Sequence, residues 1–264
     1  MTVRLIVTDL DGTFLDPVGE VSSLNRRALE FAAECGVPVV VATGRPARWL
    51  AVLDDISGVH PEVVVSNGAG VYHLPARRHT VVHGLDSQVA LQVADDLREA
   101  IPGLVFALEW GEQFGCEPGL PQDRGGWLRV GTLPELAAEP QPVLKLCAFH
   151  LGLDSDTLAQ LGREVIGDRL TMTHSHLGDY GLLEISAPGV TKASGMIGLC
   201  QRLGVDAADV VAFGDMPNDL PMLAWAGQGY AIADGHPTLL NAGFRLTEGP
   251  QDEAVGRAIL ELLG

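Results

Sequence analysis

The feature of this chain that most constrains its fold is the alternation of short, continuously apolar runs with segments of helical periodicity. Leu5–Thr8, Val37–Ala42 and Val63–Val65 are runs of this kind, without the alternation expected of a strand that has one face in water. Between the first two, apolar residues recur at helical spacing from Ser22, and Gly36 is a natural helix end. Buried strands separated by helices indicate a parallel sheet with helices on both faces.

The same pattern returns near the C-terminus. We expect a helix over Thr191–Leu203 that ends at Gly204, followed by a strand over Val210–Phe213. The other expected elements are a helix over residues 47–56, short strands over 230–233 and 244–246, and a last helix over 252–263. Together these segments predict the α/β class, as a Rossmann-like, doubly wound parallel sheet.

The middle of the chain has a different texture. Amphipathic helices are expected over Asp86–Ala100 and Ser155–Ile166, and strands over residues 105–109, 143–149, 170–173 and 182–185. The Gly- and Pro-rich segment 115–142 predicts an irregular excursion. Because 264 residues suffice for two domains, we expect a core formed by residues 1–83 and 186–264 and an inserted α+β domain over 84–185.

Charge and composition disfavour several kinds of partner. With 34 acidic and 17 basic residues the formal net charge is -17, which disfavours nucleic acids and anionic membranes. No stretch approaches the roughly 20 apolar residues of a membrane span, and Asp9 interrupts the N-terminal apolar run at once. The four cysteines lack metal-ligand spacing, and Cys35 and Cys200 are expected on apolar helix faces. We therefore expect a cytoplasmic protein with free thiols.

Polar side chains follow each expected strand of the core, which is where doubly wound sheets bind ligands. They are Asp9 and Asp11 after the first strand, Thr43 and Arg45 after the second, Asn67 after the third, and Asp215, Asn218 and Asp219 after the strand at 210–213. Lys192 begins the helix that precedes this last strand. We expect all of these side chains to converge on one crevice.

The chemistry of such a crevice points to a metal and a phosphate. Crowded carboxylates repel one another unless a hard cation neutralises them, and Mg²⁺ suits oxygen ligands. Lys192, Arg45, the Thr43 hydroxyl and backbone N–H groups would then form an anion cradle beside the metal. Lys145 and Lys192 are the two lysines among 17 basic residues, so both are candidates for a specific role. Lys145 could face a substrate or reach solvent.

The order of these motifs is similar to that of a known family. Asp9-x-Asp11-Gly12-Thr13, then Thr43, then Lys192, then Gly214-Asp215-x-x-Asn218-Asp219 resemble the four motifs of the haloacid dehalogenase superfamily. The insertion between the second and third motifs, with Asn67-Gly68-Ala69 and the approach to Lys192, is similar to the Cof-type, class IIB branch. The resemblance spans nearly the whole chain. It implies a Mg²⁺-dependent phosphatase whose inserted domain is a cap over the site.

The resemblance also implies a role for each residue. Asp9 would attack phosphorus to form an aspartyl-phosphate, while Asp11 would protonate the leaving alcohol and later deprotonate the attacking water. Asp9 and Asp215, with the backbone carbonyl of Asp11, would hold Mg²⁺. The phosphoryl group would bind to Thr43, Lys192 and Gly12. The supporting residues would be Asn218, Asp219, Arg45 and Asn67.

The expected function is hydrolysis of phosphomonoesters of small metabolites, with sugar phosphates first and phosphorylated cofactors or phosphoglycolate-like acids behind them. A phosphomutase that uses the same intermediate is an open alternative. A non-catalytic signalling module phosphorylated on aspartate is weaker, because it needs neither an acid at Asp11 nor so long an insertion. The chain could be a monomer or a homodimer, since no amphipathic face exceeds what core packing explains.

Overall fold

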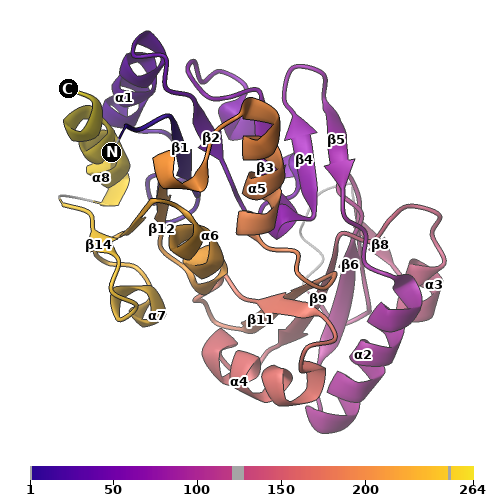
Figure 1. Ribbon diagram of the computed structural model, residues 1–264. Coiled ribbons are helices and arrows are strands. Elements are labelled where there is room, and N and C mark those ends of the chain that lie inside the picture. The colour runs from indigo at the N-terminus through magenta and orange to yellow at the C-terminus, as the bar shows by residue number, and fades with distance from the viewer. Residues whose placement is uncertain (1, 121–127, 249–250) are drawn as a thin grey trace. The chain divides into compact units, whose positions relative to one another are not determined.

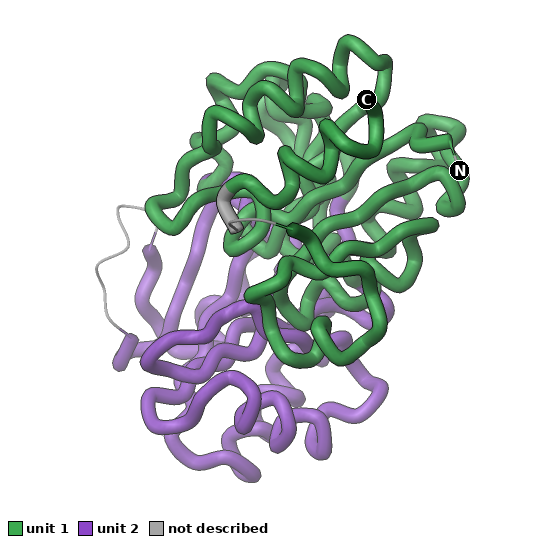
Figure 2. Tube along the Cα trace, turned by 90° about the vertical axis from the view of Figure 1, so that its left-hand side faces the viewer, with its two compact units in different colours: residues 1–45, 49–81, 191–264 green, residues 46–48, 82–190 purple. Residues whose placement is uncertain are grey.

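The chain divides into two compact units, each made of segments that are distant in sequence (Figure 2). The computed structural model describes residues 2–120, 128–248 and 251–264. Unit 1 contains residues 1–45, 49–81 and 191–264, and unit 2 contains residues 46–48 and 82–190. Among the described residues, no helix combines the length and the apolar composition needed to cross a membrane.

Unit 1 is built on a five-stranded parallel sheet in the order β14-β13-β12-β1-β2. The strands are β1 (Leu5–Thr8), β2 (Val39–Val41), β12 (Val210–Gly214), β13 (Gln228–Ala231) and β14 (Arg245–Leu246). Every residue of β1, β2 and β12 is buried, which explains why their sequences are apolar throughout. The predicted α/β class with a parallel sheet is confirmed.

Helices cover this sheet (Figure 1). They are α1 (Ser23–Glu34), α5 (Lys192–Leu203), α6 (Leu220–Trp225), α7 (Pro237–Leu240) and α8 (Gln251–Leu263). Leu5 and Val7 of β1 share one core with Met196 and Leu199 of α5. Since side chains alternate along a strand, Ile6 points to the opposite face. Cys35 is exposed at the end of α1, so its predicted burial was wrong, whereas Cys200 is buried in α5.

The run at 63–65 is a strand, β3 (Glu62–Val65), but it belongs to a separate three-stranded sheet. A parallel bridge between Ala42 and Val64 links it to the end of β2. On its other side β3 pairs antiparallel with β4 (Gly70–His73), and β5 (Arg78–Val82) completes a three-stranded sheet. The sequence did not predict β4 or β5. Residues of β5 are exposed or half-buried throughout, so the strand carries no apolar signal.

The helix predicted over residues 47–56 is not formed. Two short 3₁₀ turns stand there, Ala47–Trp49 and Ala51–Leu53. No side chain caps the second turn, and Asp54 and Asp55 follow it directly. Negative charge at a helix C-terminus opposes the helix dipole, which disfavours extension of either turn into an α-helix.

Unit 2 has a six-stranded mixed sheet in the order β10-β11-β9-β6-β7-β8. The strands are β6 (Val105–Glu109), β7 (Phe114–Cys116), β8 (Leu128–Val130), β9 (Lys145–His150), β10 (Thr171–Thr173) and β11 (Gly181–Ser186). The helices α2 (Ser87–Ala100) and α4 (Ser155–Ile166) begin after Asp86 and Asp154, whose carboxylates accept from first-turn N–H groups.

The predicted irregular excursion over 115–142 was wrong in part. It contains β8 and a short helix, α3 (Leu133–Ala137), while residues 121–127 lie outside the described residues. The Glu135 carboxylate accepts from the backbone N–H of Thr132 at 2.8 Å, which stabilises the start of α3. This Thr-x-x-Glu pattern is a capping-box signal that the sequence reading missed.

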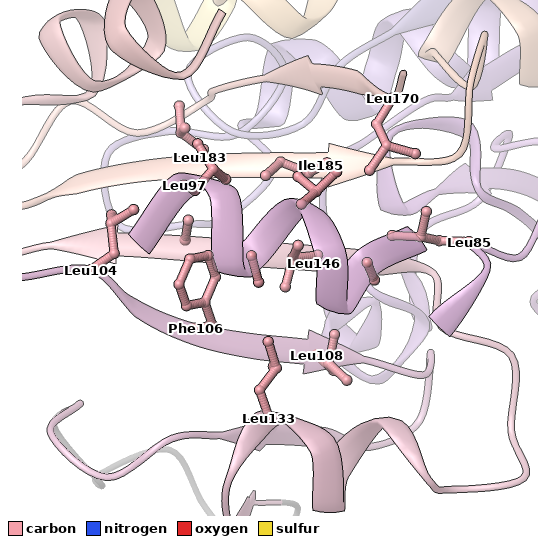
Figure 3. Close-up of a cluster of buried hydrophobic side chains, with 14 of the residues drawn as sticks. Leu85, Leu97, Leu104, Phe106, Leu108, Leu133, Leu146, Leu170, Leu183 and Ile185 are labelled. Carbon is pink, nitrogen blue, oxygen red and sulfur yellow. The ribbon is translucent and has the colours of Figure 1, made fainter. Parts of the chain in front are cut away.

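The two faces of the unit 2 sheet differ in what they pack against. One face carries Phe106, Leu108, Leu146, Leu183 and Ile185, which form a core with α2, α3 and α4 (Figure 3). Side chains alternate along the strands, so Ala107, Cys147 and Phe149 lie on the other face. There they form a second, smaller apolar cluster with Phe114 and Cys116.

Candidate catalytic site

Two neighbouring strands of unit 1 end in acidic residues. In the parallel register of β1 and β12, Thr8 pairs with Phe213, so Asp9 and Asp215 leave the same edge of the sheet. Asp219 follows as the last residue of a 3₁₀ turn, Pro217–Asp219, that leads into α6. Single carboxylate oxygens of Asp9, Asp215 and Asp219 lie within 4.8 Å of one another, and all three residues are buried.

Lys192 joins this group from the first turn of α5. Its Nζ donates to Asp9 Oδ1 at 2.6 Å and to Asp219 Oδ1 at 2.7 Å, and its side chain is wholly buried. A lysine beside a helix N-terminus is unfavourable unless anions are near, and two carboxylates supply them. Thr191 caps the helix and thereby fixes where Lys192 stands.

Asp219 organises the loop after β12 as well as Lys192. Its second oxygen, Oδ2, accepts from the backbone N–H groups of Asp215 and Met216, each at 3.1 Å. A Cβ added at Gly214 would lie 2.5 Å from Asp219 Cβ, so only glycine fits at that position. The Gly-Asp-x-x-Asn-Asp motif therefore closes on itself around one carboxylate.

Three buried carboxylates with one ammonium leave excess negative charge. Burial raises the pKa of Asp9 well above its ordinary value, repulsion from Asp219 and Asp215 raises it further, and Lys192 opposes both effects. The pKa of Asp215 rises to about 7, first because of burial and then because of repulsion from Asp219. A divalent cation would relieve this repulsion. The donor set is three carboxylates, which fits a hard ion such as Mg²⁺.

Two residues of the first motif, Gly12 and Thr13, lie against Asp215. Thr13 Oγ1 donates to Asp215 Oδ1 at 2.8 Å, a buried hydrogen bond between side chains 202 positions apart in sequence. Gly12 has a φ of +74°, and any side chain there would collide with the Asp215 carboxylate. The sequence analysis included Thr13 in the first motif but gave it no role. A threonine at this position does not reveal that its hydroxyl binds Asp215.

Asp11 stands apart from the other acids. Its side chain is 59% exposed and forms a two-pronged ion pair with Arg45, with Nε to Oδ2 at 2.8 Å and Nη2 to Oδ1 at 2.6 Å. Arg45 also donates to the carbonyl of Trp49 at 3.1 Å, and the pair raises the pKa of Arg45. The acid that pairs with Arg45 is thus Asp11 of the first motif, a partner that the sequence analysis did not identify.

The ends of β2 and β3 bring Thr43 and Asn67 to the same region. Thr43 is buried, and its Oγ1 accepts from the backbone N–H of Arg45 at 3.0 Å. Asn218 Nδ2 donates to Asn67 Oδ1 at 3.0 Å, which ties the third strand end to the loop after β12. Ser66 and Asn67 both have positive φ, at 50° and 57°, which is strained backbone of a kind that clusters at functional sites.

These contacts join most of the residues predicted for the site. One buried group contains Asp9, Lys192, Asp215 and Asp219. Two separate pairs are formed by Asp11 with Arg45 and by Asn67 with Asn218. Of the two acidic-motif residues predicted to support the site, Asp219 contacts Lys192 and Asn218 contacts Asn67. Lys145 does not reach solvent: it is buried in unit 2 and donates to Glu184 at 2.6 Å.

Comparison with known proteins gives concordant results. A family model described as haloacid dehalogenase-like hydrolase matches residues 6–259. HMP-PP phosphatase of Cronobacter sakazakii is 27% identical over 90% of this chain and 86% of its own. Pyridoxal phosphate phosphatase YbhA of Escherichia coli is 26% identical over 89% of each chain, and phosphoglycolate phosphatase of Methanothermobacter thermautotrophicus is 25% identical over 99% and 100%.

Solved structures share the fold. The protein SMU.1108c of Streptococcus mutans has a TM-score of 0.84 at 22% identity, with 99% of each chain covered. A sugar phosphatase of HAD subclass IIB has a TM-score of 0.80 at 19% identity, with 98% of each chain covered. The match of the family model over nearly all of the sequence identifies the chain, which belongs to the haloacid dehalogenase-like hydrolases, as its four motifs predicted.

Proposed function

We propose that the protein hydrolyses phosphomonoesters of small metabolites through an aspartyl-phosphate on Asp9, with Mg²⁺ as its cofactor. The observation that carries the proposal is the buried group of Asp9, Lys192, Asp215 and Asp219 at the ends of β1 and β12. A buried carboxylate that accepts a hydrogen bond from an ammonium, in a group with excess negative charge, suits a nucleophile that works beside a bound cation and a phosphoryl group.

In the first step an oxygen of Asp9 attacks phosphorus, and the bond from phosphorus to the alcohol oxygen breaks. Lys192 opposes the effect of burial on Asp9 and so favours the ionised form that attacks. Asp9 and Asp215 would hold Mg²⁺, together with the backbone carbonyl of Asp11. When bound, this ion would neutralise charge that develops on the phosphoryl oxygens. Thr43, Lys192 and the backbone at Gly12 would bind those oxygens.

Asp11 would give its proton to the departing alcohol and then take one from the water that attacks phosphorus. Release of phosphate restores Asp9. In the free protein both oxygens of the Asp11 carboxylate accept hydrogen bonds from Arg45. The ion pair must therefore open before Asp11 can contact the departing alcohol. The phosphoryl group is an anion that could draw Arg45 away.

Residues 84–185 would act as a cap, inserted into a core of residues 1–83 and 186–264, and would select the alcohol part of the substrate. Sugar phosphates are the expectation from the sequence, with phosphorylated cofactors second. The names of the relatives include both phosphoglycolate and pyridoxal phosphate, so the range to test is broad. We place the protein in the cytoplasm, as a monomer or homodimer without nucleic-acid or membrane partners. Its four free cysteines support that location.

A panel of phosphorylated metabolites assayed for phosphate release, with and without Mg²⁺, tests the proposal. Asp9→Ala should abolish release from every ester, because no nucleophile remains, and Asp11→Asn should reduce turnover while Mg²⁺ binding is largely kept. Undiminished release by Asp9→Ala would contradict the mechanism. Isomerisation of a phosphosugar without phosphate release would point to a phosphomutase instead.

A further inference from the structure

The turn between β3 and β4 has a backbone conformation that a hairpin does not require. The two strands pair on either side of residues 66–69, which form a four-residue loop. Loops of this length are most often built on a type I turn, whose central residues have negative φ. Here φ is positive at three consecutive residues, at 50° for Ser66, 57° for Asn67 and 97° for Gly68. Strain of this kind persists only where surrounding contacts hold it.

Backbone hydrogen bonds connect the turn to the residues that follow β2. The N–H of Ser66 donates to the carbonyl of Arg45 at 3.0 Å, and the N–H of Asn67 donates to the carbonyl of Thr43 at 3.1 Å. Ser66 and Asn67 are both buried. The turn therefore fixes the path of the backbone that carries Thr43, one of the residues proposed to bind the phosphoryl group.

Gly68 connects the turn to the start of α5. A Cβ at this position would collide with the carbonyl oxygen of Thr191 and would lie 3.3 Å from the backbone nitrogen of Lys192. Because not even a methyl group fits, the backbone of the turn lies directly against the first residues of the helix. The place of Lys192 is thus set by the turn as well as by the helix cap.

The side chain of Asn67 connects the turn to the loop after β12. Its Oδ1 accepts from Asn218 Nδ2 at 3.0 Å, and the next residue, Asp219, accepts from Lys192. Within the described ranges, Asn67 Nδ2 and Asn218 Oδ1 are buried atoms without a hydrogen-bond partner. Such atoms are rare in folded proteins, and water or a ligand often supplies the missing partner. The pair therefore has hydrogen-bonding capacity to spare for a ligand.

We propose that the turn Ser66–Gly68 positions the groups that bind the phosphoryl oxygens. Resting on the proposed phosphatase function, Gly68 and Asn67 are positioning residues. Gly68 acts on Lys192, and Asn67 acts on Asn218. One strained turn touches three segments that are far apart in sequence, so it keeps their spacing when no substrate is bound. Partners that are already in place bind a ligand at a lower cost in conformational entropy.

The variant Asn67→Gly separates this role from the stability of the fold. Glycine adopts positive φ without strain, so the turn keeps its backbone while the contact with Asn218 is lost. Inorganic phosphate is titrated by calorimetry into the full-length protein with Mg²⁺ present. We expect the affinity for phosphate to fall about fivefold while the Tm stays close to that of the unaltered protein.

Gly68→Ala and Gly227→Ala form a matched pair for the contact with α5. In each variant the new Cβ would collide with a backbone carbonyl oxygen of unit 1, that of Thr191 or that of Ala208. Gly227 precedes β13, so it lies at the edge of the parallel sheet opposite to Asp215. We expect Gly68→Ala to lower the affinity for phosphate about tenfold. Gly227→Ala should lower the Tm and leave this affinity unchanged.

The possible results distinguish the role of the turn from the proposed function. Unchanged phosphate affinity in Asn67→Gly, equal losses in the two alanine variants, or no phosphate binding by the unaltered protein would overturn the inference. The expected losses of phosphate binding, without phosphate release from any ester by the unaltered protein, would instead refute the proposed function and leave the role of the turn.

Discussion

Asp9 and Asp11 are two residues apart, yet their carboxylates occupy opposite environments. Asp9 is buried against Lys192, whereas Asp11 is largely exposed and held by Arg45. The sequence predicts the pair because both acids follow a buried strand and precede Gly12. It cannot predict the difference, which depends on Arg45 after β2 and Lys192 of α5, two side chains from distant sequence.

Thr13 should tune the metal site through its hydrogen bond to Asp215. Replacing it by valine keeps the shape of the side chain and removes the donor to Asp215 Oδ1. We expect the affinity for Mg²⁺ to fall about tenfold, as is usual when a partner of a metal ligand is lost. Calorimetric titration of Mg²⁺ measures this. Thr13→Ser, which keeps the hydroxyl, is the control and should stay close to the original affinity.

The pH dependence of stability should report on Asp215. Its pKa is about 7 in the folded protein against 3.8 for the ordinary side chain, so between about pH 4 and 7 the folded state binds more protons than the unfolded state. Without metal, this group's contribution to stability is therefore present at low pH and is lost as the pH rises to 7. Asp215→Asn removes the titration. We expect its Tm to exceed that of the unaltered protein by several degrees at pH 7.5, and by much less at pH 5.

The same carboxyl must lose its proton to bind a cation. Added Mg²⁺ should therefore raise the Tm more at pH 8 than at pH 6, and should have little effect on Asp215→Asn. Thermal scans of both proteins with and without the ion test this. An equal effect of Mg²⁺ at the two pH values would count against Asp215 as a ligand.

Helices and strands whose limits are marked by nearby residues were predicted from the sequence, and those without such residues were missed. Helix α5 starts and ends where Thr191 and Gly204 indicate, because a cap and a left-handed glycine act on their immediate neighbours. The hairpin of β4 and β5 has no comparable signal, since β5 buries no residue fully. Residues 47–56 form two short turns despite their apolar spacing, and Asp54 and Asp55 near the end of the segment oppose the dipole of a longer helix.

Helix α5 also contains two glycines that should respond in opposite ways to alanine. A Cβ at Gly198 would have no neighbour within 4 Å, whereas a Cβ at Gly195 would lie 2.6 Å from Val64 Cγ1 of β3. We expect Gly198→Ala to stabilise the protein by about 0.5–1 kcal/mol, through the lower backbone entropy of its unfolded state. Gly195→Ala should destabilise it by about 1–3 kcal/mol through overpacking.

Denaturant unfolding of the two variants gives these free energies directly. The same substitution in the same helix controls for intrinsic helix propensity. A loss of stability in both variants would contradict the prediction, because it would mean that a side chain at position 198 does meet neighbouring atoms.

At the scale of the whole molecule, the structure has two compact units, and the sequence changes in texture near residues 84 and 185. The class of the fold was predictable because parallel strands buried on both faces must be apolar throughout. The exact limits of the two units were not, since residues 46–48 belong with unit 2 although they follow β2 in the chain. Arg48 has no apolar signal, and its place depends on Glu109 and Gly111.

Unit 2 should fold without unit 1. Its apolar core draws only on its own helices and strands, from Leu85 to Ile185. A fragment of residues 82–190 should therefore unfold in one cooperative transition, at a lower Tm than the same unit in the full chain, because Glu109 loses its ion pair with Arg48. Circular dichroism on heating measures this. A broad transition without a folded-state baseline would mean that the core of unit 2 cannot fold without unit 1.

The two lysines described above divide between the units, with Lys192 in unit 1 and Lys145 in unit 2, and both side chains are buried. An amine-selective reagent can modify either side chain only when the surrounding unit opens. The extent of modification at each site, read by peptide mass spectrometry over time, would therefore measure the opening free energy of each unit separately.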